Sequence, residues 1–297
     1  MTPDDVRRVL SNEALAAIQA RPGFRAACEQ AAAGAIDHNA GLDPRHRWIT
    51  NDLGRSAICL VALVLQYTGG LTMRGLTTAC VERDVSSPGR VAQVVRRCQD
   101  IGDLTVEPGR GMWTRRPMRV EPRLADLMRR RAVIDLEAAL TLFPDEAELV
   151  HALDDEAGFM GFVVNLADAV RWRERLFGAR TSPLTYFLDR EAGMVILFRL
   201  LMAQPPERER MLEAAPVSRQ ELARDYRVSR VHVTRLLTES GHARLEGGRV
   251  VFSEALSQAF AGHMSMVFGL NLCVSRAVAQ WRASGSVRET REDREAG

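Results

Sequence analysis

The chain has 297 residues, enough for two or three domains with separate cores, and 46% of them are hydrophobic, as in globular rather than disordered proteins. Its formal net charge of +2 excludes a generally basic protein. The charge is unevenly distributed. Residues 71–120 hold nine arginines against five acidic residues and residues 217–252 hold seven against four, whereas residues 121–160 hold four against ten.

Residues 1–50 are predicted to form a helical arm. Apolar residues recur at helical spacing between Asp4 and Ala20, whereas residues 34–47 are polar and are expected to form a loop. The arm would pack on the domain that follows it, or it would form a dimer contact. The N-terminus lacks the apolar run of a signal peptide and no stretch approaches ~18 uncharged apolar residues. We therefore expect a cytoplasmic protein that does not enter a membrane.

Residues 51–120 are predicted to form a first domain of three helices and a β-hairpin. The apolar stretch Ser56–Tyr67 would be its buried first helix. Ser87 begins the third helix, which would run to about Ile101, because a serine hydroxyl accepts a hydrogen bond from a free backbone N–H and the following proline suits the first helical position. Residues 104–120 then predict short strands around the turn-forming cluster Pro108–Gly111.

Residues 121–185 are predicted to be a helical connector. Its segments, 124–142, 144–157 and 159–177, are separated by Pro144 and Gly158. Farther along the chain, residues 254–282 predict a long helix with a wide apolar face, which would pack on the connector or form a dimer seam. Residues 283–297 are charged and low in apolar content, which predicts a disordered tail.

Residues 186–253 carry the most specific pattern in the chain. An apolar helix at Met194–Met202 precedes two short helices that meet at a tight turn within Leu222–Leu237. Ser229 stands where the second of these helices needs an N-cap, and residues 244–252 follow as strand, Gly-Gly, strand. The pattern resembles the winged helix-turn-helix of bacterial transcription regulators. A weaker copy lies in residues 51–120, where Ser87 aligns with Ser229 and the helix before the turn slips by about one residue.

The resemblance implies a mainly α protein with two winged helix-turn-helix domains, each with a small β-hairpin wing, that bind double-stranded DNA. In such domains the second helix of the motif enters the major groove, where arginine and glutamine read base edges, while the wing reaches phosphates or the minor groove. The residues expected to contact DNA are Ser87, Arg90, Gln93, Arg96, Arg97, Arg110, Arg115, Arg116, Ser229, Arg230, His232, Thr234, Arg235 and Arg249.

The leading hypothesis is a sequence-specific transcription regulator that covers two unequal half-sites with one chain, or a palindrome as a homodimer. A replication initiator of the plasmid or phage type is one alternative. A chromosome-structure adaptor, whose paired winged helices bind protein instead of DNA, is another, although the arginine-rich segments argue against it. A ligand-gated regulator with an effector in the apolar region around Phe159–Trp172 is a third, although no polar groups converge there clearly.

No motif in the sequence points to an enzyme. GxGxxG and P-loop patterns are missing, the chain has no lysine, and the six histidines form no zinc-binding spacing. The five cysteines are scattered, odd in number and without a CxxC pair, so we expect buried thiols in a reducing compartment. We expect no catalytic residue, no cofactor and no metal.

Overall fold

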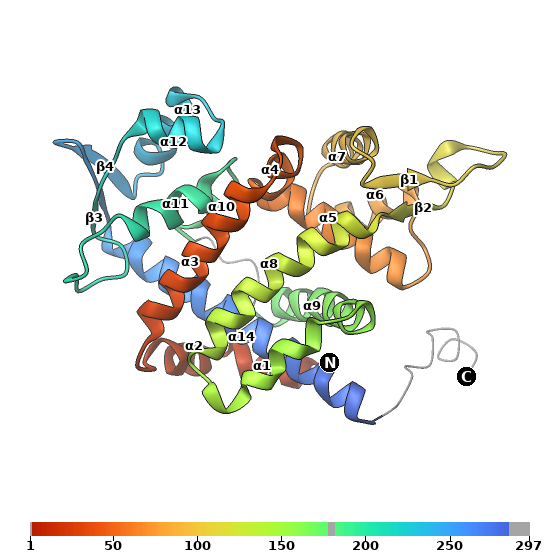
Figure 1. The fold of residues 1–297 in the computed structure, drawn as a ribbon, viewed down its shortest axis with the longest axis horizontal. Coiled ribbons are helices and arrows are strands. Elements are labelled where there is room, and N and C mark those ends of the chain that lie inside the picture. The colour runs from red at the N-terminus through yellow and green to blue at the C-terminus, as the bar shows by residue number, and fades with distance from the viewer. Residues whose placement is uncertain (1, 178–181, 285–297) are drawn as a thin grey trace.

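The computed structural model describes residues 2–177 and 182–284, which are mainly helical with two small antiparallel sheets (Figure 1). The first helices are α1 (Pro3–Leu10), α2 (Asn12–Gln19), α3 (Phe24–Gly41), α4 (Pro44–Thr50), α5 (Leu53–Tyr67), α6 (Met73–Glu82) and α7 (Pro88–Asp100). They are followed by β1 (Leu104–Val106), the 3₁₀ turn η1 (Trp113–Arg115), β2 (Met118–Val120), α8 (Pro122–Leu140), the 3₁₀ segment η2 (Pro144–Leu153), α9 (Glu156–Phe177), α10 (Thr185–Leu188) and α11 (Gly193–Met202). The last elements are β3 (Ala214–Pro216), α12 (Arg219–Tyr226), α13 (Arg230–Thr238), β4 (Ala243–Glu246), β5 (Arg249–Phe252) and α14 (Glu254–Ser284).

Helices α5, α6 and α7 and the hairpin β1–β2 pack together and are called the first unit below. Ile58, Leu76 and Val91, one from each helix, are all at most 1% exposed and lie in its core. Leu104 pairs with Val120 in the hairpin, and an isolated bridge from Thr72 to Pro117 joins the hairpin to the segment that leads into α6. Because the apolar face of α7 is buried in this core, its polar face points outward.

The second unit consists of α11, β3, α12, α13, β4 and β5, in that order along the chain. Its sheet has the order β3-β5-β4, so the strand that precedes the two short helices is added to the hairpin that follows them. Gly247 and Gly248 join β4 to β5, and both have positive φ, which is what the tight turn of a two-residue hairpin requires. Val233, Leu236 and Leu237 on α13 are fully buried beneath it.

The turns that precede α7 and α13 differ by one residue. In each, an αL residue ends the earlier helix, and the next amide donates to a carbonyl five residues back: Val85 to Cys80 at 2.8 Å and Val228 to Ala223 at 3.1 Å. In the second unit Ser229 follows at once as the cap, whereas Ser86 intervenes before Ser87 in the first. This extra residue accounts for the one-residue shift between the two copies that the sequence predicts.

The rest of the chain forms a helical body around α14. This helix packs against α1, α2, α8, α9 and η2, so its buried residues, such as Phe260 and Phe268, are covered within the chain. The apolar face of α14, for which the sequence allowed either packing on the connector or a dimer contact, is thus largely covered by helices of the same chain. Two of the three predicted connector helices are present as α8 and α9, whereas the segment predicted at residues 144–157 is the 3₁₀ segment η2, which has non-helical φ and ψ at Glu146. Of the predicted tail, Ala283 and Ser284 belong to α14, and the remainder, residues 285–297, lies outside the described residues.

One expectation for residues 1–50 is wrong and another holds for one helix only. Residues 34–47 are not a loop, because α3 continues to Gly41 and α4 begins at Pro44 after an Asp43 cap. Of the arm, α4 packs on α5 of the first unit, whereas α3 packs on α11 of the second unit and on α8. The buried face of α3 is built largely from alanines, including Ala27, Ala31 and Ala35, which allow close approach of the neighbouring helices but give little hydrophobic contrast in the sequence.

No single helix within residues 2–177 and 182–284 is long and apolar enough to cross a membrane. The pair α4 and α5 reaches that length and composition only when taken together, and the two helices are bent by 92°.

Candidate nucleic-acid interface

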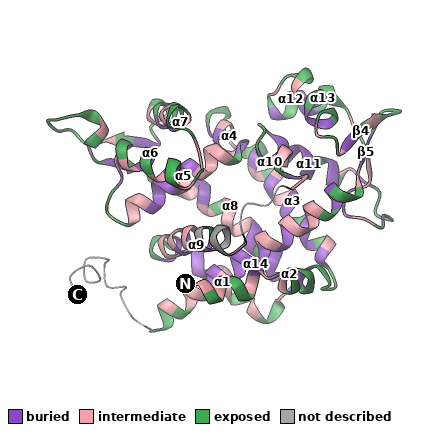
Figure 2. Cartoon of the chain, turned by 180° about the vertical axis from the view of Figure 1, so that it is seen from behind, coloured by how far each residue is buried: buried purple, intermediate pink, exposed green. Residues whose placement is uncertain are grey.

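Helices α7 and α13 lie along the same edge of the molecule, with α4 between them (Figures 1 and 2). The hairpin β1–β2 extends from one end of this edge and the hairpin β4–β5 from the other (Figure 1). Sequence predicted the helices and the hairpins but had no means of placing the two units beside each other. The arrangement puts two serine-capped helices where one extended ligand could contact both.

Both caps have the same geometry. The hydroxyl of Ser87 accepts from the Arg90 amide at 3.4 Å, and the hydroxyl of Ser229 accepts from the His232 amide at 2.9 Å. Each serine therefore satisfies one of the free N–H groups of its helix. Both serines are exposed, so each hydroxyl can still donate a hydrogen bond to a ligand.

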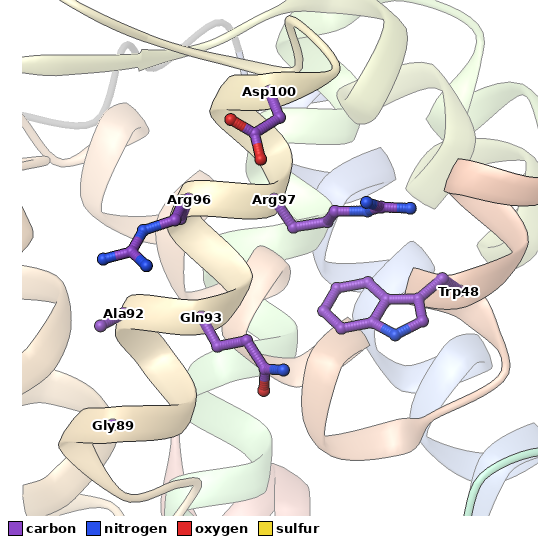
Figure 3. Close-up of a pocket in the computed structure, with 7 residues that line it drawn as sticks. All are labelled: Trp48, Gly89, Ala92, Gln93, Arg96, Arg97 and Asp100. Atoms are coloured by element: carbon purple, nitrogen blue, oxygen red, sulfur yellow. The ribbon is translucent and has the colours of Figure 1, made fainter.

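On α7, Gln93, Arg96 and Arg97 are exposed on the outward face, as expected. Together with Gly89, Ala92, Asp100 and Trp48 of α4 they line an open pocket of about 470 Å³ (Figure 3). The Arg97 guanidinium carbon lies 5.9 Å from the centre of the Trp48 ring. An indole from a neighbouring helix therefore forms one wall of a surface otherwise made by α7.

On α13, Arg230 and Arg235 are exposed, whereas Thr234 is half-buried. Thr234 accepts a hydrogen bond from Arg219 at 3.3 Å and donates one to the Arg230 carbonyl at 3.0 Å. Arg235 lies 3.6 Å from Glu239, one turn farther along the helix, with 68% of its side chain exposed. Arg230 has no ion-pair partner among the described residues.

Arg90 and His232 do not face outward as the sequence suggested. Both are half-buried and both stand three residues after a serine cap. The Arg90 guanidinium pairs with the carboxylate of Asp52, the cap of α5. The His232 Nε2 lies 2.8 Å from the Glu191 carbonyl oxygen, so Nε2 is the donor. Arg90 therefore connects α7 to the residue just before α5, and His232 connects α13 to a residue just before α11. These contacts turn both side chains away from the outward face.

A chain of polar contacts runs from α7 to α13 through these residues. Asp52 also lies 3.7 Å from Arg55, and Arg55 donates to the Glu191 carboxylate at 3.0 Å. The sequence of contacts is therefore Arg90, Asp52, Arg55, Glu191 and His232. The Arg55 guanidinium carbon also stacks 4.0 Å above the Trp48 ring centre, so its orientation is fixed from two sides.

The hairpins carry further arginines. Arg110 and Arg115 are exposed on the first hairpin, and Arg116 is half-buried and lies 3.5 Å from the Gly111 carbonyl. On the second hairpin Arg249 is exposed and donates to the Ala214 carbonyl at 3.3 Å. Of these four, Arg110 and Arg115 are the ones whose side chains make no hydrogen bond or ion pair to another described residue.

Cys59, Cys80 and Cys98 lie in the buried core of the first unit. A hydrogen bond between the side chains of Cys59 and Cys98, together with burial, raises the pKa of Cys59 well above its usual range, and burial raises the pKa of Cys80 to about 11. The thiols of Cys59 and Cys80 therefore stay protonated and unreactive at neutral pH. Among residues 2–177 and 182–284, no three His, Cys, Asp or Glu side chains are placed to hold a metal ion.

Sequence reasoning missed Trp48, Asp52 and Val231. Val231 is 59% exposed on α13 beside Arg230, although an exposed valine in a helix is easily assigned to the core from sequence. Asp52 stands directly before an apolar helix and could have been recognised as a cap. Trp48 gave no signal, because its place beside α7 depends on the fold of residues 44–97.

Comparison of the chain with protein-family models, with curated proteins and with solved structures found no match. The case for its function therefore comes from the residues of this chain alone.

Proposed function

We propose that the first and second units are winged helix-turn-helix domains and that the chain is a sequence-specific, double-stranded DNA-binding transcription regulator. The observation that carries the proposal is the common edge occupied by α7 and α13, with a hairpin at each end (Figures 1 and 2). Each helix has a buried apolar face and an outward face with exposed arginines. A DNA duplex is an extended ligand with evenly spaced grooves, which suits two such faces in a row.

The order of elements supports this assignment. In the second unit it is helix, strand, helix, helix and hairpin, with all three strands in one sheet. The first unit repeats the order, with the Thr72–Pro117 bridge in the position of the first strand. In a winged helix-turn-helix the third helix enters the major groove and the hairpin contacts the backbone or the minor groove beside it.

Charge supports DNA rather than protein as the ligand. The two units carry the arginine excess of the chain, while the connector between them is acidic. Within the edge, Arg96, Arg97 and Arg230 have no carboxylate partner among the described residues, so phosphates or base edges can supply one. In this proposal Gln93 and Arg230 contact base edges, and Val231 provides an apolar contact for a thymine methyl group. A cytoplasmic location belongs to the same proposal.

Selection from a random-sequence duplex library by the full-length chain tests the proposal. We expect a two-part motif, with protection of both halves in a footprint and a steep loss of affinity as salt rises. The variants Gln93→Ala and Arg230→Ala should each change base preference in one half only. Arg8→Ala is the matched control, because Arg8 is exposed on α1, away from the edge.

Failure of the wild-type chain to enrich any sequence, together with weak, salt-insensitive binding, would contradict the proposal and favour a protein-docking adaptor. Mapping the enriched motif on the genome then separates two kinds of DNA-binding protein. Single sites upstream of genes support a regulator, whereas tandem repeats at a replication origin would contradict it and indicate an initiator.

A further inference from the structure

Two large apolar side chains are exposed together on the first hairpin. Met112 is 66% exposed and Trp113 is 54% exposed. They lie between β1 and β2, on the hairpin that extends from the outer end of the edge (Figure 1). Burying such side chains stabilises a contact by roughly 1.5–3 kcal/mol each, so leaving both in water is costly unless a partner covers them.

The backbone holds these two residues in a defined turn. The Arg115 amide donates to the Met112 carbonyl at 2.9 Å, and the Arg116 amide donates to the Trp113 carbonyl at 3.2 Å. Gly111, with φ of 113°, begins the turn in a conformation that a residue with a Cβ rarely adopts. Met112 and Trp113 therefore stand on a folded support that is already formed before any partner binds.

The surroundings of the pair are strongly basic. Residues 107–119 contain four arginines, Arg110, Arg115, Arg116 and Arg119, against the single acidic Glu107. Of these arginines, Arg119 is paired with Glu121 at 3.3 Å, while Arg110 and Arg115 are exposed without a carboxylate partner in the described chain. An apolar pair flanked by cations is complementary to the minor groove, where base edges lie between two rows of phosphates. An ordinary protein surface would not require that charge.

We propose that Met112 and Trp113 form a wedge that enters the minor groove, inserts between two base pairs and bends the DNA at the outer end of the site. This inference rests on the proposed DNA-binding function and adds a mechanical role to the first unit. The second hairpin cannot act in this way, because its turn is Gly247-Gly248 and carries no side chain. The bend is therefore asymmetric, at the half-site of the first unit only.

The test uses the full-length chain and the duplex that it enriches from a random library, with fluorescent dyes at the two ends. We expect the wild-type chain to bend this duplex by about 20–90°, the range found for side-chain wedges. The double variant M112A/W113A should bind it without bending. Met202→Ala is the control, because Met202 is also an exposed methionine, 40% exposed, but lies on α11.

A second measurement is the preference for DNA that is already unstacked. A single mismatch at the wedge step lowers the cost of insertion, so the wild-type chain should bind the mismatched duplex about tenfold more tightly than the intact one. M112A/W113A should show no preference. The fluorescence of Trp113, obtained as the difference between the wild type and Trp113→Phe, should be quenched on binding because the indole stacks on a base.

The outcomes separate this inference from the function on which it rests. If no duplex is bound by the wild-type chain, the DNA-binding proposal fails. If the wild-type chain binds its selected site but leaves it straight, with no Trp113 quenching and no mismatch preference, the wedge is refuted while DNA binding stands. Equal bending by the wild type and M112A/W113A, with both proteins folded by circular dichroism, would also refute it.

Discussion

Arg55 and Glu191 form an ion pair of 3.0 Å between the first turn of α5 and the segment that enters α11. The pair links the two units directly, and its polar contacts continue to α7 through Asp52 and to α13 through the Glu191 carbonyl. Since α7 and α13 are both fixed to the same chain of contacts, their separation is set by the protein. A rigid protein of this kind tolerates only a narrow range of half-site spacing.

Arg55→Ala should widen that range. We expect the variant to bind each half-site normally but to lose the penalty for inserting or deleting one or two base pairs between them. The measurement is a binding series on spacer variants of the selected site. Arg224→Ala is a suitable control, because Arg224 is exposed and pairs only with the adjacent Asp225 among described residues. A spacing profile for Arg55→Ala identical to that of the wild type would show that other contacts fix the geometry.

Asp52 should be important for stability as well as for geometry. It caps α5 by accepting from the Arg55 amide at 2.9 Å and pairs with Arg90 at a buried position. Asp52→Ala removes the cap, which costs about 1 kcal/mol, and a charged hydrogen bond, which costs roughly 1.5–3 kcal/mol. Asp52→Asn keeps the cap and loses mainly the charge, so the decrease in its free energy of unfolding should be smaller. Urea unfolding of the two variants measures the difference, and equal losses would contradict the role of charge.

Arginines on helices and on hairpins should differ in what they contribute to DNA binding. Arg230→Ala should relax base preference at one position, with a loss of about 1–3 kcal/mol for a base contact. Arg110→Ala should weaken binding to all sequences alike and reduce the slope of log affinity against log salt by about 1. Salt titrations on the selected site and on scrambled DNA separate the two effects. Similar changes in both variants would mean that α13 contacts only phosphates.

Two helical glycines should respond in opposite ways to alanine. A Cβ on Gly193 would lie 2.0 Å from the Phe187 carbonyl oxygen, so α10 and α11 can approach only because the side chain is absent. Gly193→Ala should cost about 1–3 kcal/mol or more through backbone displacement. Gly262, within α14, has nothing within 4 Å of such a Cβ, so Gly262→Ala should stabilise by roughly 0.5–1 kcal/mol. Thermal unfolding of both variants provides the comparison.

His38 should make stability depend on pH near neutrality. Burial, followed by the charges of Arg131 and Arg130, lowers the pKa of His38 below its ordinary value of 6.5. Above about pH 6.5 the imidazole is neutral in both folded and unfolded chains, and its contribution to stability is complete. As the pH falls, the unfolded chain binds the proton first, so the free energy of unfolding decreases until the folded pKa is passed. In His38→Gln the difference in unfolding free energy between pH 8 and pH 5.5 should be smaller than in the wild type.

Local sequence determined most of the individual elements. Ser87 and Ser229 cap helices because a hydroxyl next to a helical run satisfies a free amide, and that rule needs no information from the rest of the chain. Gly247 and Gly248 form a tight turn for an equally local reason, since both adopt positive φ. The sequence predicts a loop at residues 34–47, although α3 extends to Gly41, because the buried face of α3 is made largely of alanines, which give little hydrophobic contrast.

Only the tertiary structure decided which way Arg90 and His232 turn. On a helical projection both residues lie beside the outward arginines. In the structure, however, Arg90 reaches the Asp52 carboxylate before α5, and His232 reaches the Glu191 carbonyl before α11. Asp52 and Glu191 are 38 and 41 residues away from these partners, so no local pattern predicts the pairs. For the same reason the sequence could indicate two similar units but not that α7 and α13 share one edge, because that placement depends on long-range packing and on the Arg55–Glu191 contact across 136 residues.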